Sequence, residues 1–181
     1  MERNTARLKE LVGRTVKHGT FTLASGETSD FYIDGRLVTL DQEGSLLIGA
    51  EAAHVARELG ATALGGPATA ACPIVTAAGI CALEQGLRLK LFYARGEAKK
   101  HGTKKLVEGP ALEAADRVLV VDDVVTSGGS FLKAIAALRE ETKARIVGAF
   151  ALVDRLQGGR EKLAAEGVEL HSVFTRADFK P

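Results

Sequence analysis

Cysteine is scarce in this chain of 181 residues, and so are several other marks of secreted, metal-bound or membrane proteins. The two cysteines, Cys72 and Cys81, lie in an apolar, alanine-rich stretch, which favours buried small side chains over a disulfide or metal site. No apolar run reaches about 18 residues and no signal peptide is visible, so we expect a soluble, cytoplasmic protein without membrane contact. Metal-ligand spacing is also missing among the four histidines, which are His18, His54, His101 and His171.

A strong charge of one sign is also lacking. The formal net charge is +1, which argues against a nucleic-acid partner bound through a broad basic face. Hydrophobic residues make up 46% of the chain, so a disordered chain is excluded as well. The length allows one domain with a sizeable core and a small appendage.

The two commonest nucleotide-binding motifs are absent. No Gly-Lys dipeptide occurs anywhere in the chain, and a P-loop requires one. The G-x-G-x-x-G pattern that marks a dinucleotide fold after a strand is absent too.

What the sequence does contain is an apolar run that leads into two carboxylates, at Val118–Ser130. The β-branched residues before Asp122 and Asp123 predict a buried parallel strand, and the hydroxyl- and glycine-rich residues after them predict a loop that opens a helix. Such a loop can surround a phosphate with its backbone N–H groups, while carboxylates at the strand end can hold hydroxyl groups. The pattern therefore favours a phosphorylated sugar as ligand, with a purely structural loop as the alternative.

Strand and helix patterns alternate over most of the chain, which predicts an α/β fold with a mostly parallel sheet and helices on both faces. The N-terminal part does not alternate, so we expect a helix and hood segment at 1–40 and an α/β core at 41–181. Short strand-like runs at 21–23 and 31–34 suggest a hairpin around Ser25 and Gly26. The expected helices are 3–17, 42–59, 73–85, 129–141 and 159–166, and the expected core strands are 61–65, 87–94, 117–122, 144–153 and 168–174.

A long basic loop follows the strand predicted at 87–94. Residues 95–105 carry five lysines or arginines and one histidine against one glutamate, with glycines on both sides of the cluster. A loop of this length in a compact domain is usually a functional lid or a solvated segment, and composition alone leaves both open. Beside a phosphate site, a mobile basic loop could neutralise an anionic leaving group and exclude water.

The strand, acidic pair and loop resemble the signature of type I phosphoribosyltransferases, which bind phosphoribosyl pyrophosphate (PRPP). The resemblance implies their fold, a mostly parallel Rossmann-like sheet flanked by helices with a small N-terminal hood. It implies that Asp122 and Asp123 hold the ribose and that Mg²⁺ is the cofactor. No dedicated protein ligand for the metal is expected, apart from contact of Asp122 and Asp123 with it, directly or through water. The remaining residues implied to bind PRPP are Val124, Val125, Thr126, Ser127, Gly128, Gly129 and Ser130.

The basic loop is similar to a narrower family, the orotate phosphoribosyltransferases, whose catalytic loop reads R-K-E-A-K-x-H-G. Residues 95–102 match this motif except at Gly96. The resemblance implies that Arg95, Lys99 and His101 contact pyrophosphate in the active site of a neighbouring subunit. It therefore implies a homodimer that shares the loop 95–108 between subunits.

Further segments fit the same family. The residues implied to bind orotate are Phe31, Tyr32, Thr126 and Arg155, and an arginine suits an anionic pyrimidine. Residues 21–26 resemble a segment near the base, and residues 66–68 resemble a loop that contacts pyrophosphate. The chain departs from the family at Ala24, Ala70 and Gly96, where many members have lysine.

The sequence thus predicts a pentosyltransferase that joins orotate to PRPP, giving orotidine 5'-monophosphate and pyrophosphate in pyrimidine biosynthesis. Two alternatives stay open at this point. One is a phosphoribosyltransferase for another base, and the other is a non-catalytic regulator that senses PRPP.

Overall fold

The computed structural model describes residues 3–22, 28–96 and 105–179, without the side chains of residues 18, 22 and 28–30. Within these residues a six-stranded sheet runs in the order β5-β4-β3-β6-β7-β8. All neighbouring strands are parallel except β5, which pairs antiparallel with β4. The predicted mostly parallel sheet is confirmed. The strands are β3 (Ala63–Pro67), β4 (Lys90–Ala94), β5 (Val107–Glu108), β6 (Arg117–Val125), β7 (Arg145–Asp154) and β8 (Leu170–Thr175).

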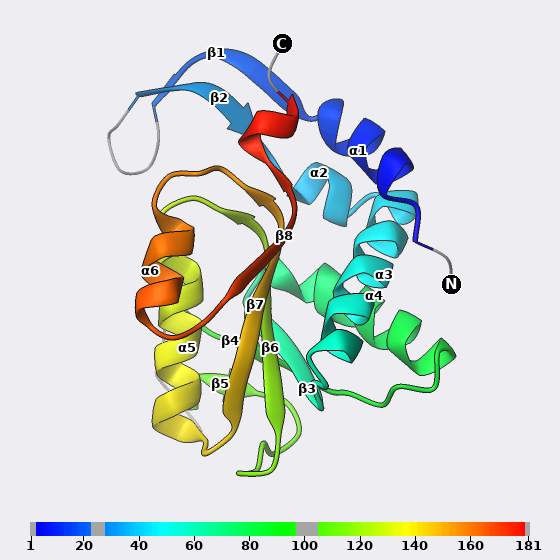
Figure 1. The fold of residues 1–181 in the computed structure, drawn as a ribbon, viewed down its shortest axis with the longest axis vertical. Helices are drawn as coiled ribbons and strands as arrows, with labels where there is room; N and C mark the ends of the chain where they lie inside the picture. The colour runs from blue at the N-terminus through cyan, green and yellow to red at the C-terminus, as the bar shows by residue number, and fades with distance from the viewer. Residues whose placement is uncertain (1–2, 23–27, 97–104, 180–181) are drawn as a thin grey trace.

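Helices cover both faces of this sheet (Figure 1). On one face, α3 (Gln42–Glu58) and α4 (Ala71–Glu84) pack over a core that contains Ile48 and Ile74. On the other face, α5 (Gly129–Glu141) and α6 (Gly159–Ala165) pack over a second core that contains Phe131 and Leu163. The central strand β6 is buried from Val118 to Asp122, which explains why its sequence is apolar without alternation.

The N-terminal elements form a hood beyond one end of the sheet. These are α1 (Thr5–Gly13), the antiparallel hairpin of β1 (Val16–Thr22) and β2 (Thr28–Ile33), and α2 (Arg36–Thr39). Strand β8 leads directly into a short 3₁₀ helix, η1 (Arg176–Phe179), which lies beside the hairpin (Figure 1). The carboxyl ends of the parallel strands therefore face the hood.

Several element boundaries differ from those predicted. The helix expected at 3–17 ends at Gly13, because Val16 and Lys17 pair with Ile33 and Tyr32 in the hairpin. No sequence pattern indicated α2, β5 or η1, since each contains only two to four residues. The helix expected at 42–59 and the helix expected at 129–141 agree with α3 and α5 to within one residue.

Both cysteines are free, but only Cys81 is fully buried, while Cys72 is half-buried. The prediction of two buried cysteines is therefore wrong for Cys72. Among the described residues, no helix is long and apolar enough to cross a membrane.

Candidate active site

The predicted acidic pair lies at the topological switch point of the sheet, where the order in which the strands are added changes side. From β3 the chain continues to β4 on one side, and later returns to β6 on the other side. Open α/β sheets bind their ligands at such a switch point, outside the carboxyl ends of the strands. Asp122 and Asp123 lie near the carboxyl end of β6, at this place.

Asp122 is almost completely buried, with an exposed fraction of 3%. Its carboxylate accepts hydrogen bonds from Ser130 Oγ at 2.9 Å and from the backbone N–H of Asp123 at 3.0 Å. Burial, together with the nearby charge of Asp123, raises the pKa of Asp122 to about 7. The site therefore holds a carboxyl group that a cation or hydroxyl donors would stabilise in its ionised form.

Asp123 is half-buried and faces the hood. Its carboxylate accepts the backbone N–H of Val124 at 2.7 Å, and burial raises its pKa above the ordinary value. On its other side lies the backbone of Gly35, where an added Cβ would be 2.5 Å from Asp123 Oδ2. The hood thus contacts the acidic pair directly.

The loop that follows the acidic pair opens helix α5. Gly128 has a left-handed backbone (φ 78°) and precedes the first residue of α5. The first turn of a helix leaves backbone N–H groups without intrahelical partners, and these can bind an anion. Gly159 at the start of α6 supports the loop, since an added Cβ would lie 2.7 Å from the Thr126 carbonyl oxygen.

Arg155 follows β7 and lies under the hood, with an exposed fraction of 6%. Its Nη2 donates a hydrogen bond to the carbonyl oxygen of Phe31 at 2.8 Å, and its guanidinium lies 5.8 Å from the Phe31 ring centre. A second guanidinium, that of Arg176 in η1, lies 5.5 Å from the same ring. Burial, with a smaller contribution from Arg176, lowers the pKa of Arg155. The structure thus brings Arg155 into contact with Phe31, whose neighbour in β2 is Tyr32, and their role in binding orotate stays a prediction.

Asp154, which precedes Arg155, is fully buried, and its carboxylate stabilises the turn after β7. It accepts the backbone N–H of Leu156 at 2.8 Å and Arg160 Nε at 3.0 Å. This turn includes a left-handed backbone at Leu156 (φ 56°).

The start and end of the basic loop lie in the described part of the chain, whereas Lys99 and His101 lie outside it. Arg95 forms an ion pair with Glu108 across β4 and β5 (Nε–Oε1, 3.0 Å) and lies 5.9 Å from the Tyr93 ring centre. After the loop, Glu141 accepts the backbone N–H groups of Leu106 at 2.6 Å and Val107 at 3.0 Å. Both ends of the loop are therefore tied to the core.

The remaining residues of interest are placed as follows. Pro67 and Ala68, at the end of β3, are half-buried next to the switch point, and Ala70 directly precedes α4. Gly96 is exposed, whereas Ala24 lies outside the described residues.

Asp122 and Asp123 are the residues best suited to hold a metal. Carboxylate oxygens are ligands that Mg²⁺ prefers, and a cation would favour the ionised forms of Asp122 and Asp123, whose pKa values are raised mainly by burial. No group of three or more His, Cys, Asp or Glu side chains that could hold a metal occurs in the described ranges. Two adjacent carboxylates at the strand end fit Mg²⁺ as part of its ligand set.

Three residues at the site were not predicted from the sequence, namely Gly35, Arg36 and Arg176. Arg36 binds Asp34 in a two-pronged ion pair, with distances of 2.8 Å to Oδ1 and 2.9 Å to Oδ2. Nothing in the local pattern marks these residues, because their place depends on how the hood and the C-terminal segment pack onto the sheet.

The fold and the position of the acidic pair define a phosphoribosyltransferase class of protein, and residues 52–175 match the family model for the phosphoribosyl transferase domain. The orotate phosphoribosyltransferase of Aquifex aeolicus is 42% identical over 154 residues, which cover 85% of this chain and 83% of that protein. The chain belongs to the orotate phosphoribosyltransferase family.

Solved structures agree with this assignment. A crystal structure of orotate phosphoribosyltransferase from Mycobacterium tuberculosis superimposes with a TM-score of 0.84 at 36% identity, covering 98% of this chain and 99% of that one. A structure of the M. tuberculosis enzyme in complex with PRPP gives a TM-score of 0.78 at 31% identity, over 97% of this chain and 91% of that one. The predicted fold and family are thereby confirmed.

Proposed function

We propose that this chain transfers the phosphoribosyl group of PRPP to orotate, giving orotidine 5'-monophosphate and pyrophosphate in the synthesis of pyrimidine nucleotides. The observation that carries this proposal is the buried acidic pair at the end of β6, directly before the loop that opens α5. Family membership and a related protein solved with PRPP support the choice of substrates.

In this proposal the ribose and the 5'-phosphate of PRPP bind to the β6–α5 segment. Asp122 and Asp123 accept hydrogen bonds from the ribose hydroxyls. The backbone from Val124 to Ser130 surrounds the phosphate, and the N-terminus of α5 adds partial positive charge. Ser130 contributes indirectly as well, since its hydroxyl holds the Asp122 carboxylate at 2.9 Å.

Mg²⁺ is proposed as the cofactor, and Asp122 and Asp123 would hold it, directly or through water, together with substrate oxygens. Its chemical contribution is to neutralise negative charge on the departing pyrophosphate. The protein's own contribution is mainly to position both substrates and to stabilise charge, without a protein nucleophile.

Orotate is proposed to bind under the hood, beside Phe31, Tyr32, Thr126 and Arg155. Arg155 is anchored by its bond to the Phe31 carbonyl oxygen, so its charge is held in place before the base arrives. The planar guanidinium suits the carboxylate or carbonyl edge of an anionic pyrimidine. Arg95, Lys99 and His101 are proposed to contact the pyrophosphate, with the loop acting as a lid.

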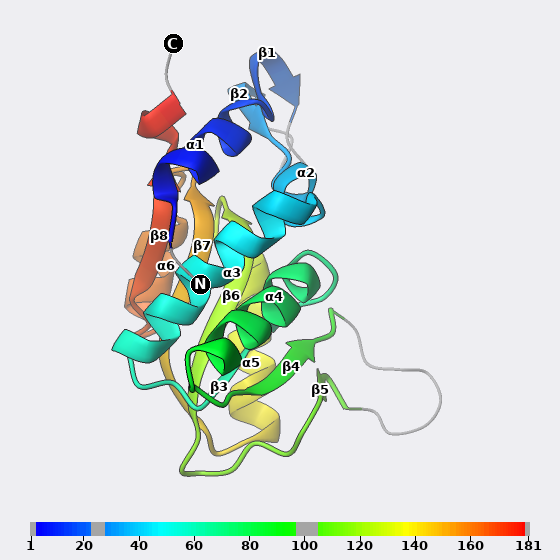
Figure 2. The same ribbon diagram turned by 90° about the vertical axis from the view of Figure 1, so that its right-hand side faces the viewer.

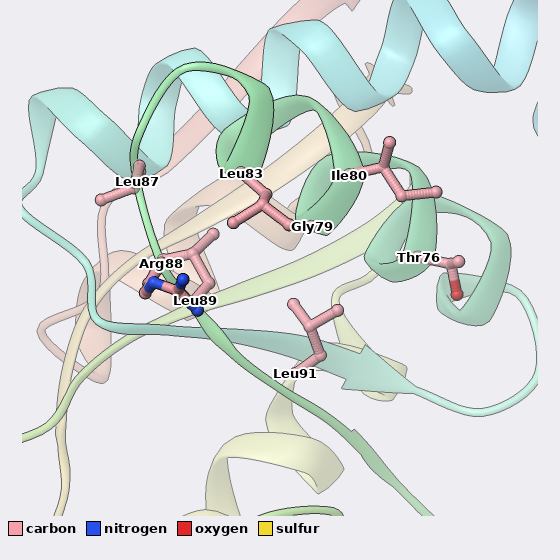
Figure 3. A pocket seen from close by; sticks show the side chains of 8 residues that line it. All are labelled: Thr76, Gly79, Ile80, Leu83, Leu87, Arg88, Leu89 and Leu91. Carbon is pink, nitrogen blue, oxygen red and sulfur yellow. The ribbon is translucent and has the colours of Figure 1, made fainter.

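We also propose that the active unit is a homodimer, in which the loop 95–108 acts on the partner. Support comes from exposed apolar side chains on α3 and α4, which cover one face of the sheet, and on the neighbouring α2 segment of the hood. Figure 2 shows these three helices on the same side of the molecule. A groove with a volume of about 300 Å³ lies between α4 and β4, with Ile80, Leu83 and Leu91 in its lining (Figure 3). The chain runs from β4 directly into the basic loop. A second copy of the chain bound in this groove would therefore lie close to the loop of the first copy. The exposed side chains are Leu37, Leu40, Leu46, Ile80 and Leu83.

The proposed activity is tested by the loss of orotate absorbance in the presence of PRPP and Mg²⁺, in parallel with adenine, hypoxanthine and uracil. We expect turnover with orotate and with none of the other three bases. Turnover with another base would favour a phosphoribosyltransferase of different specificity, and PRPP binding without any turnover would favour a regulator. The predicted cytoplasmic location and the predicted division at residue 41 stay predictions.

A further inference from the structure

The backbone of Gly35 lies against the side chain of Asp123. A Cβ added to Gly35 would be 2.5 Å from Oδ2, 2.9 Å from Cγ and 2.9 Å from Cβ of Asp123. Real Cβ atoms essentially never approach other heavy atoms to less than 3.0 Å, so any side chain here would force a shift. Gly35 itself is buried.

The glycine is not required by the local backbone conformation. Gly35 has φ −59° and ψ −25°, which is the right-handed helical region that every residue adopts readily. Alanine at such a position is normally neutral or stabilising, because it restricts the unfolded chain. The close approach to Asp123 is therefore the feature of this structure that calls for glycine.

The turn that carries Gly35 is also held firmly in place. Its carbonyl oxygen accepts the backbone N–H groups of Val38 at 3.0 Å and Thr39 at 2.9 Å, and both of these residues are buried. Helix α2 packs closely on α3, since a Cβ at Gly44 would lie 2.3 Å from the Val38 carbonyl oxygen. The turn cannot move away from Asp123 without disturbing this packing.

Charged side chains on either side of Gly35 strengthen the turn. Asp34 accepts the backbone N–H of Arg36 at 3.1 Å and pairs with the Arg36 guanidinium, so the ion pair bridges the glycine. The charge of Arg36 favours the ionised form of Asp123, and the charge of Asp34 opposes it.

We infer that Gly35 is a positioning residue for the transfer reaction: the α2 turn acts as a fixed stop that sets the orientation of the Asp123 carboxylate. The inference rests on the proposed function, in which Asp123 holds the ribose of PRPP. It extends that function by giving the hood a part in PRPP binding, in addition to its contacts with the base.

The direct test compares Gly35→Ala with the matched control Gly13→Ala, where an added Cβ meets nothing within 4 Å. Calorimetry with Mg²⁺ present measures the affinity for PRPP. We expect this affinity to fall roughly tenfold to a hundredfold in Gly35→Ala, because a charged hydrogen bond between the ribose and Asp123 would be misplaced. The KM for orotate should stay close to wild type, while the melting temperature should fall modestly because the added Cβ crowds Asp123 Cβ and Cγ. The control should leave PRPP affinity and the KM for orotate unchanged, with a melting temperature equal to or slightly above wild type. Unchanged PRPP affinity in Gly35→Ala would overturn the inference.

A double-mutant cycle shows whether Gly35 acts through Asp123. Asp123→Ala removes two of the three nearest atoms, so Gly35→Ala should have almost no further effect on PRPP affinity in that background. Equal effects of Gly35→Ala in both backgrounds would contradict the inference. If Asp123→Ala alone leaves PRPP affinity unchanged, the proposed role of Asp123 fails instead, so the two failures are distinguishable.

Discussion

At the scale of single residues, Asp122 combines a negative charge with nearly complete burial. Its raised pKa means that the folded protein binds a proton there more tightly than the unfolded chain does. The stability that this proton provides is fully present below the ordinary carboxyl pKa, near 4. It is lost as the pH rises toward about 7, the value in the folded protein.

The first prediction concerns this linkage. In the absence of substrates, Asp122→Asn should remove part of the loss of stability between pH 4 and pH 7, since asparagine carries no titrating proton. The difference in the free energy of unfolding between wild type and variant should change by at most about 1.4 kcal/mol per pH unit. Urea unfolding at several pH values measures it, and parallel profiles for the two proteins would show that Asp122 is not responsible.

A second residue-scale prediction concerns the base. Arg155→Gln should weaken orotate binding roughly tenfold to a hundredfold, because a charged hydrogen bond is lost, and should affect PRPP binding far less. Arg145→Gln is the matched control, since Arg145 is an exposed arginine at the start of β7, whereas Arg155 directly follows the end of that strand. Equal losses for orotate and PRPP in Arg155→Gln would mean that Arg155 does not read the base.

Only some of the site residues could be predicted from the sequence. The acidic pair could be predicted, because a strand, two carboxylates and a glycine-rich loop are consecutive in the chain. Gly35 and Arg176 could not, because they reach the site only through the packing of the hood and of η1. Contacts between segments far apart in sequence leave no local pattern.

At the scale of elements, the start of α6 supports the loop before α5. Gly159→Ala would place a Cβ 2.5 Å from Val125 Cγ2 and 3.0 Å from the backbone nitrogen of Gly128. We predict weaker PRPP binding and a loss of stability of about 1–3 kcal/mol, typical of overpacking. Calorimetry and thermal unfolding measure the two effects, with Gly13→Ala as control, and unchanged PRPP affinity would argue against a phosphate site in this loop.

The long elements were predictable because their apolar residues recur with helical or strand periods over many positions. Helices α3 and α5 are examples, each ending close to the expected residue. The start of strand β1 could not be predicted, since Val16 also fits the apolar stripe of the preceding helix. Its pairing with Ile33 is what places Val16 in the strand. Strand β5 depends wholly on its partner β4, so two residues of sequence could not reveal it.

At the scale of the whole molecule, the proposed shared loop makes a quantitative prediction. Mixing inactive Asp122→Asn/Asp123→Asn subunits with inactive Lys99→Ala/His101→Ala subunits should restore activity. About half of the dimers would be hybrids with one intact site each, so activity should reach roughly a quarter of the wild-type level. If the subunits demonstrably exchange and activity stays at zero, the loop acts within its own chain.

The most direct test of the central claim is the rate of orotidine 5'-monophosphate formation in the Asp122→Asn/Asp123→Asn protein compared with wild type, with PRPP, orotate and Mg²⁺ at saturation. Circular dichroism and thermal unfolding would establish that the fold is intact. We predict turnover in wild type and its loss by several orders of magnitude in the variant, together with weaker PRPP binding. Wild-type turnover and PRPP affinity in a folded variant would contradict the account, because the acidic pair of β6 would then not be the site of the reaction.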